Sequence, residues 1–456
     1  MIQYAAFKEK ILRPSAVCIL MRSNMQVKRD IFLKRLIARR RNGMVKVITG
    51  LRRCGKSYLL GVLYKGYLLA DGVRQDHIIE VALDEPSNYK YHNPLKLEKH
   101  LKRQIKDNGD YYVFIDEVQF VKRIKVRDPE LEEKDEITFY SVINSLMRKG
   151  NVDVYVTGSN SKMLSSDIRT EFRGRGDEVR LTPFTFSEFM QVFSGDARDG
   201  WDEYVVYGGL PLAVLANGHE AKSRYLRNLF EETYLKDVVE RGKIRKPEHL
   251  ADIVDVLASN IGSLTNPLNL ENTFKTVKRE VLKSKTIASY IAKLRDAYLI
   301  EQAKRYDIKG RKYISAQMKY YFADPGLRNA RLDFRQIEET HLMENIIFNE
   351  LKVQGFDVDV GIVESFEKNA VGNGIRKQLE IDFMANRGRE RYYVQSALSI
   401  DDQDKAAQEK RPFTKLGDSF RKIITVKGKM PPRIDEKGYV IVGLVDFLLN
   451  PSAILV

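Results

Sequence analysis

One octapeptide constrains this chain more than any other stretch. Residues 50–57 read Gly-Leu-Arg-Arg-Cys-Gly-Lys-Ser, between an apolar run at 44–49 that predicts a strand and a run at 58–63 that predicts the start of a helix. Gly50 and Gly55 allow backbone torsions and a close approach that a Cβ would forbid. Successive N–H groups and the helix N-terminus can then turn toward an anion. The octapeptide therefore predicts a phosphate-binding loop.

Two residues of this loop carry chemistry of their own. Lys56 would reach the β- and γ-phosphates of a nucleotide, and the Ser57 hydroxyl would hold Mg²⁺. A chance match to the pattern is the alternative, and the flanking strand and helix argue against it. We therefore expect ATP and Mg²⁺ as ligands. The residues predicted to contact nucleotide are Gly50, Arg53, Cys54, Gly55, Lys56, Ser57 and Tyr58.

A second predicted strand ends in two carboxylates. The apolar run 111–115 leads into Asp116 and Glu117, which is typical of a parallel strand buried on both faces. Ligands gather at the carboxyl ends of such strands. Asp116 would hold the Mg²⁺ water shell, and Glu117 would polarise the water that attacks the γ-phosphate. Such a pair is also common as a helix cap, but its position about sixty residues after the loop favours the catalytic interpretation.

Two further residues are candidates for catalysis. The predicted strand 151–160 ends in polar residues, so Ser159 or Asn160 would sit beside Asp116 and orient the attacking water. Asn160 equally suits the N-cap of a following helix. Arg175, in the glycine-flanked loop 172–177, is placed either as a finger on a neighbouring subunit's phosphate or as a surface charge. The expected catalytic set is Lys56, Glu117, Asn160 and Arg175, with Ser57 and Asp116 as metal ligands.

Composition limits the class of protein. A chain of 456 residues suggests two or three domains, and 43% hydrophobic with 30% charged residues excludes a disordered or membrane protein. No apolar run approaches the length of a membrane span, so we expect no membrane part. The two cysteines are Cys18 and Cys54, and because Cys54 lies in the loop, we expect no disulfide and a cytoplasmic location. The formal charge of +15 makes DNA a candidate partner.

The middle of the chain predicts a helical region with a hairpin. Gly208 and Gly209 mark a break, and three predicted helices at 250–260, 270–282 and 286–295 precede predicted strands at 299–303 and 312–314. Three helices and a hairpin make a winged-helix-like unit, which binds either DNA or other proteins. The outward side chains of its third helix would be Lys283, Lys285, Ser289 and Lys293, while Ile287, Ile291 and Leu294 face inward.

The last segment resembles the restriction-endonuclease-like fold. A predicted helix at 341–351 and predicted strands at 379–385 and 391–397 follow that layout. Glu344 and Asp382 match the first two positions of its metal site. Gln395 stands where a second acidic ligand is expected, and Ala397 stands where a lysine is expected. Because a neutral amide binds a hard cation weakly and alanine carries no charge, we expect the nuclease chemistry to be lost.

From about Met25 onward the chain resembles a group of bacterial and archaeal AAA-type ATPases whose ATPase domain is followed by the domain of unknown function 4143. This resemblance implies ATP binding and hydrolysis, and little about a substrate. It rests on Gly-Leu-Arg-Arg-Cys-Gly-Lys-Ser at 50–57, Ile-Asp-Glu-Val-Gln at 115–119, Thr-Gly-Ser-Asn at 157–160, Gly-Arg at 174–175, Pro-Phe-Thr-Phe-Ser-Glu-Phe at 183–189, Tyr-Gly-Gly-Leu-Pro at 207–211 and Tyr-Phe-Ala-Asp-Pro-Gly-Leu at 321–327.

The predicted architecture is an α/β P-loop NTPase with a parallel sheet and helices on both faces, followed by the winged-helix-like region and the nuclease-like α/β domain. The predicted function is a Mg²⁺-dependent ATPase that couples nucleotide state to its C-terminal domains. A nucleotide-switched DNA-binding regulator with little turnover is the alternative, and a metal-dependent nuclease is third. Assembly as a homo-oligomer and a protein client stay open. The predicted domains are 1–24 (tail), 25–200, 201–330 and 331–456.

Overall fold

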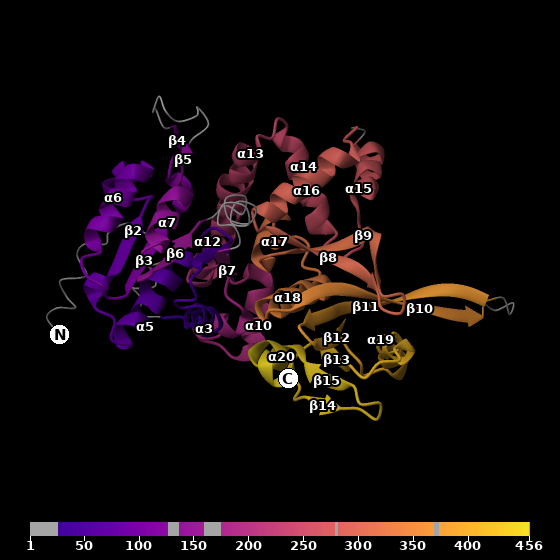
Figure 1. Ribbon diagram of the computed structural model, residues 1–456. Coiled ribbons are helices and arrows are strands. Elements are labelled where there is room, and N and C mark those ends of the chain that lie inside the picture. Colours follow the sequence, from indigo (N-terminus) through magenta and orange to yellow (C-terminus); the bar gives the residue numbers. More distant parts are fainter. Residues whose placement is uncertain (1–25, 126–135, 159–174, 279–280, 369–373, 456) are drawn as a thin grey trace. The chain divides into compact units, whose positions relative to one another are not determined.

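The computed structural model describes residues 26–125, 136–158, 175–278, 281–368 and 374–455 (Figure 1). The chain divides into two compact units between Thr182 and Pro183. This division comes earlier in the sequence than the predicted border after residue 200, and the predicted tail 1–24 lies outside the described residues. Among the described residues, no helix has both the length and the apolar character needed to cross a bilayer.

The first unit is built on a parallel sheet in the order β2-β3-β6-β1-β7 (Figure 1). The strands predicted at 44–49, 111–115 and 151–160 are present as β1, β3 and β6, so the predicted α/β parallel sheet is confirmed. The elements of this unit are α3 (Asp30–Ala38), β1 (Val45–Gly50), α4 (Lys56–Tyr58), a π-helical segment (Leu59–Tyr64), α5 (Lys65–Ala70), β2 (Ile78–Ala82), α6 (Pro94–Gln104), β3 (Tyr111–Asp116), β4 (Ile124–Lys125), β5 (Glu136–Ile137), α7 (Phe139–Met147), β6 (Val152–Thr157) and β7 (Gly176–Leu181).

Helices cover both faces of this sheet, which explains why its central strands are apolar throughout. On one face, Leu97 and Leu101 of α6 and Ile143 of α7 pack in a single core with alternate residues of β1, β2, β3 and β6. On the other face, the Tyr64 ring lies 6.0 Å from Phe114 and 4.9 Å from Tyr155, centroid to centroid. The helical stretch that follows the phosphate loop is thereby fixed against β3 and β6.

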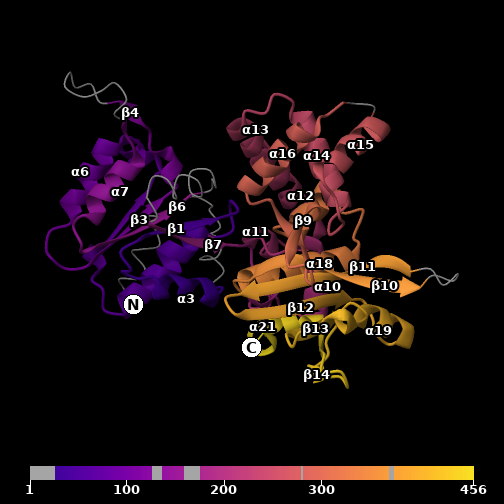
Figure 2. The same cartoon turned by 45° about the vertical axis from the view of Figure 1, so that its right-hand side comes forward.

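The second unit contains an eight-stranded sheet in the order β14-β15-β13-β12-β11-β10-β8-β9 (Figure 2). Its strands are β8 (Ile300–Asp307), β9 (Lys312–Phe322), β10 (Asp357–Lys368), β11 (Gly374–Arg387), β12 (Glu390–Ala397), β13 (Arg421–Val426), β14 (Arg433–Ile434) and β15 (Val440–Gly443). Its helices are α9 (Phe186–Phe189), α10 (Ala197–Tyr207), α11 (Pro211–Val214), α12 (Gly218–Asn228), α13 (Lys236–Gly242), α14 (Pro247–Ser259), α15 (Pro267–Thr273), α16 (Ser284–Asp296), α17 (Pro325–Arg331), α18 (Glu339–Val353), α19 (Gln403–Lys410), α20 (Leu444–Leu449) and α21 (Pro451–Ile454).

The predicted helices of the winged-helix-like region are present as α14, α15 and α16, and β8 pairs with β9 in an antiparallel hairpin. β8 also pairs in parallel with β10, so the hairpin is the edge of the large sheet. The predicted border after residue 330 therefore has no counterpart in the sheet, and the winged-helix assignment stays a prediction. Ile287, Ile291 and Leu294 are buried as expected, whereas Lys293 turns back and donates to the Gly242 carbonyl at 2.8 Å.

Asp324 joins two of the sequence motifs of this unit. One carboxylate oxygen accepts from the Gly209 N–H at 2.7 Å, and the other accepts from the Leu327 N–H at 3.1 Å. Gly209 also accepts, through its carbonyl, the Phe184 N–H at 2.8 Å. A Cβ on Gly209 would lie 2.1 Å from the Phe184 oxygen, so only glycine fits there. The motifs at 183–189, 207–211 and 321–327 thus form one packed junction.

A buried carboxyl in α18 makes the stability of this unit depend on pH. Burial raises the pKa of Glu350 to about 7, although Gln354 donates to it at 2.7 Å. The folded state therefore binds more protons than the unfolded state between about pH 4.5 and 7, and stability falls as pH rises through this window. We expect Glu350→Gln to raise the free energy of unfolding at about pH 8, by roughly 3 kcal/mol at most.

Urea denaturation at about pH 5 and about pH 8 measures this effect. The exposed Glu436→Gln is the matched control and should leave the free energy of unfolding unchanged at both pH values. A Glu350→Gln protein that is less stable than the wild type at about pH 8 would contradict the prediction.

Candidate nucleotide site

The phosphate loop connects β1 to α4 as the sequence predicts. Gly50 ends β1 with φ of 128°, and a Cβ there would lie 2.0 Å from the Leu181 carbonyl oxygen. Gly55 has φ of 100° and precedes Lys56, the first residue of α4. Both positions therefore require glycine, one for close approach to β7 and both for a positive φ. The predicted order of strand, loop and helix is thus present, with a glycine of positive φ on each side of the loop.

Arg29, just before α3, supports this loop, and sequence reasoning missed it. Its side chain is 1% exposed, and it donates to the Cys54 carbonyl at 3.2 Å and to the Thr182 carbonyl at 2.8 Å. The guanidinium also lies 4.7 Å from the centroid of Phe32, three residues later on the buried face of the helix. That spacing is the only sequence signal that could have identified Arg29. One buried cation thus fixes the loop to the chain that follows β7.

Lys56 and Cys54 are both enclosed by the loop. The Lys56 ammonium is 5% exposed and donates to the carbonyls of Gly50 at 3.1 Å and Leu51 at 3.0 Å. A nucleotide phosphate would compete with these two carbonyls for the ammonium. The Cys54 thiol is buried 3.6 Å from the Leu181 carbonyl oxygen, and burial raises its pKa. The Cys54 N–H donates to the Leu51 carbonyl at 3.4 Å, so a bound phosphate would have to replace that acceptor.

The two predicted metal ligands are in contact. The Ser57 hydroxyl donates to one carboxylate oxygen of Asp116 at 2.6 Å, and the Thr157 hydroxyl donates to the other. Burial raises the pKa of Asp116, and the charge of Glu117 raises it further. A hydroxyl and a carboxylate are hard oxygen donors, which suits Mg²⁺. No cluster of three or more His, Cys, Asp or Glu side chains in the described chain could hold a metal, so Mg²⁺ would complete its shell with phosphate and water oxygens.

Glu117 is held beside these residues by its backbone and by its side chain. It has a left-handed backbone with φ of 55°, and its N–H donates to the Thr157 hydroxyl at 3.1 Å. The Gln119 amide donates to the Glu117 carboxylate. Thr157 therefore contacts both acids at the end of β3. The sequence analysis predicted Ser159 or Asn160 beside Asp116 instead. Asn160 itself lies outside the described residues.

Three other residues predicted for the site, Arg53, Tyr58 and Arg175, differ from one another in exposure and in distance from the loop. Arg53 is exposed in the loop, whereas Tyr58 is buried in α4. Arg175 is exposed, and its carbonyl accepts the Val45 N–H at 2.8 Å where β1 begins. The loop follows the carboxyl end of β1, whereas Arg175 lies beside the amino-terminal end of the same strand. Arg175 is therefore roughly 17 Å from the loop, the length of β1. Arg175 cannot reach its own loop, and its action on a neighbouring subunit stays a prediction.

The family comparison agrees with this geometry, because residues 42–190 match the family described as AAA domain. We therefore refer to the first unit as the AAA domain, after the family that it is similar to. Residues 198–338 match a family described as domain of unknown function 8612. The resemblance to ATPases followed by the domain of unknown function 4143 is thus confirmed for the AAA domain and wrong for the domain after it.

Two relatives extend over most of the chain, and both are described only as uncharacterized proteins. One from Haemophilus influenzae is 29% identical over 434 residues, which is 94% of this chain and 100% of the relative. One from Methanocaldococcus jannaschii is 25% identical over 382 residues, which is 80% of this chain and 77% of the relative. Among solved structures, a Walker-type ATPase of Pyrococcus abyssi aligns with 71% of this chain and 99% of its own, at 16% identity and a TM-score of 0.47.

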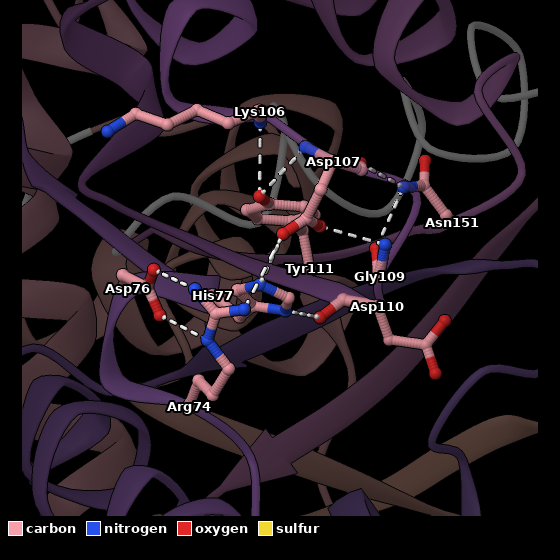
Figure 3. Close-up of polar contacts among 9 residues, drawn as sticks. All are labelled: Arg74, Asp76, His77, Lys106, Asp107, Gly109, Asp110, Tyr111 and Asn151. Atoms are coloured by element: carbon pink, nitrogen blue, oxygen red, sulfur yellow. Dashed lines mark hydrogen bonds and ion pairs between the residues drawn. The ribbon is translucent and has the colours of Figure 1, made fainter.

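A second polar cluster of the AAA domain, drawn in Figure 3, lies where β2 and β3 begin, whereas the loop follows the carboxyl end of β1. The His77 ring stacks on Tyr111 with centroids 4.3 Å apart, and its nitrogens contact the Asp110 carbonyl at 3.1 Å and the Asp107 carboxylate at 3.3 Å. The Tyr111 hydroxyl accepts the Lys106 N–H at 3.0 Å. These contacts fix the turn that leads into β3, and we assign the cluster no ligand.

In the second unit, a lysine lies among the carboxylates that the nuclease-like layout assigns to a metal. The Lys319 ammonium, from β9, is 3.1 Å from Glu344, 2.8 Å from Glu380 and 4.0 Å from Asp382. Burial lowers the pKa of Lys319, but these carboxylates outweigh it and raise the pKa above its usual value. The Gln395 amide oxygen accepts the Asp382 N–H at 3.4 Å. One cation of the chain itself thus lies among three carboxylates, and the nuclease-like assignment stays a prediction.

We expect Arg29→Met to destabilise the AAA domain. The substitution leaves two buried carbonyls without a donor, at a cost of roughly 2 to 3 kcal/mol. Arg29→Lys keeps one donor and should cost less. Urea denaturation measures the difference, with the exposed loop arginine variant Arg53→Met as the control. Equal stability of Arg29→Met and Arg53→Met would show that the buried guanidinium does not hold the loop.

Proposed function

We propose that the protein binds ATP and hydrolyses it with Mg²⁺, and that the nucleotide state of the AAA domain is passed to the second unit. The observation that carries this proposal is the set of contacts at the carboxyl ends of β1, β3 and β6. There Ser57 contacts Asp116, and Thr157 contacts both Asp116 and Glu117. A loop that only bound phosphate would need none of the contacts to Glu117.

Each residue has a distinct role in this proposal. The loop N–H groups and Lys56 bind the phosphates, and Ser57 and Asp116 hold the metal. Bound Mg²⁺ would neutralise charge on the β- and γ-phosphates. Glu117 accepts a proton from water as the water oxygen bonds to the γ-phosphorus. The bond from the γ-phosphorus to the oxygen that bridges it to the β-phosphate breaks, which leaves ADP and phosphate. Thr157 fixes the backbone of Glu117, so the carboxylate is presented from a rigid strand end.

Assembly is a separate part of the proposal. Arg175 lies at the amino-terminal end of β1, and the loop follows its carboxyl end. Arg175 would therefore act only on the phosphate of a neighbouring copy. A homo-oligomer with Arg175 at the interface would bring a positive charge to each site. The protein client of such an assembly is not specified by any residue of the site.

Substitutions of Lys56 and Glu117 test hydrolysis against the binding-only alternative. We expect Lys56→Ala to abolish nucleotide binding. Glu117→Gln should bind ATP with little change and lose turnover by roughly 10²- to 10⁴-fold, since it removes the general base. Phosphate release and a fluorescent nucleotide measure the two effects. A wild-type protein that binds ATP through Lys56 but releases no phosphate would instead be the nucleotide-switched regulator.

Thr157 offers a sharper test, because sequence reasoning did not assign it. Thr157→Val keeps the shape of the side chain but removes the hydroxyl that contacts Asp116 and Glu117. We expect kcat to fall roughly tenfold to a hundredfold while ATP affinity changes little, since misplacing a catalytic group is costly. Thr157→Ser retains the hydroxyl and should recover most of the rate. Turnover by Thr157→Val at the wild-type rate would remove Thr157 from the mechanism.

A further inference from the structure

Six exposed cations of the second unit lie on α16, at the residue just before it, and on the connection between α13 and α14. We call this set the basic face. No Asp or Glu of the described residues is paired with any of the six, whereas Arg331 nearby pairs with Asp255 at 2.5 Å. Segments 236–246 and 283–295 together hold nine Lys and Arg residues and two Asp and Glu residues. The members of the basic face are Lys243, Arg245, Lys246, Lys283, Lys285 and Arg295.

The two segments form one surface. The ammonium of Lys293 on α16 donates to the carbonyl of Gly242, the last residue of α13, at 2.8 Å. A Cβ on Gly242 would lie 2.9 Å from the Lys293 side chain, so the bare glycine lets the two helices meet. α13, α14 and α16 lie side by side in both views of the ribbon (Figures 1 and 2). The charges on 243–246 are therefore beside those on α16.

The exposed side of α16 has an unusual composition. Its buried side carries Ile287, Ile291 and Leu294, and no acidic residue occurs in the helix before Asp296. Between the two terminal cations of the exposed side lie only small side chains, which would let a ligand approach the helix closely. The exposed positions, spaced as one helical stripe, are Lys285, Ala288, Ser289, Ala292 and Arg295.

We propose that the basic face binds double-stranded DNA. Cations that no carboxylate of the described residues pairs with can contact phosphates and release counterions. The exposed stripe of α16 carries no aromatic side chain on which the bases of a single strand could stack. It also carries no large apolar side chain that could enter a lipid surface. A helix with a slim, basic outer side fits the major groove of a duplex. The proposal does not rest on ATP hydrolysis.

Binding of the full-length protein to a fluorescent duplex of about 30 base pairs tests the proposal, with anisotropy measured over a range of salt concentrations. Affinity should fall steeply with salt, with a log–log slope of about −0.9 for each phosphate contact. Lys283→Ala combined with Lys285→Ala should weaken binding at least tenfold and make the slope shallower by about two. Arg245→Ala combined with Lys246→Ala should do the same from the other segment, and it keeps the test valid if the first pair fails to fold.

The matched control removes the same charge from α6 of the AAA domain, by Lys96→Ala combined with Lys99→Ala. It should change affinity less than twofold. An equal loss in the control would overturn the proposal, because net charge alone would then explain binding. Equal or tighter binding of the single strand would overturn the duplex as the ligand. The duplex would also be overturned as the ligand if the protein bound vesicles containing phosphatidylserine but no duplex, and if the same variants abolished vesicle binding. Carrying out the assay in Lys56→Ala without nucleotide separates this result from the proposed ATPase.

Discussion

The geometry of the candidate nucleotide site depends on the position of β6 between β1 and β3. Because the three strands are parallel, their carboxyl ends lie at the same end of the sheet. The phosphate loop and the acidic pair are thereby separated by one strand, and the last residue of that strand, Thr157, fills the gap. Its single hydroxyl donates to Asp116 and accepts from the Glu117 N–H. The acids are therefore positioned from a neighbouring strand as well as from their own.

The sequence predicted those features that depend only on residues close together in the chain. The strand, loop and helix around Gly50 and Gly55 could be predicted because torsional freedom and apolar runs are properties of a short segment. Arg29 could not, since its partners Cys54 and Thr182 lie 25 and 153 positions away. Thr157 ends an apolar run like any strand residue, and only the strand order gives it a role. The register of β1 with β7 likewise shows that Arg175 is far from its own loop.

In the second unit, the same limit applies to the predicted border after residue 330, which has no counterpart in the large sheet. The hairpin of β8 and β9 follows three helices, so by local pattern it resembles a separate small domain. Its parallel pairing with β10, some fifty positions later, makes it part of the large sheet instead. The junction around Asp324 shows the opposite case. Its three motifs could be seen in the sequence. The structure shows that their glycines and aspartate contact one another.

The enclosure of Cys54 has a consequence for the chemistry of the loop. The thiol lies inside the candidate phosphate loop, yet it is buried against the Leu181 carbonyl, and burial raises its pKa. Alkylating reagents and peroxide attack thiolates that solvent can reach. A cysteine enclosed in this way contributes packing under the phosphate cradle. The nucleotide site is thereby insulated from the redox state of its surroundings.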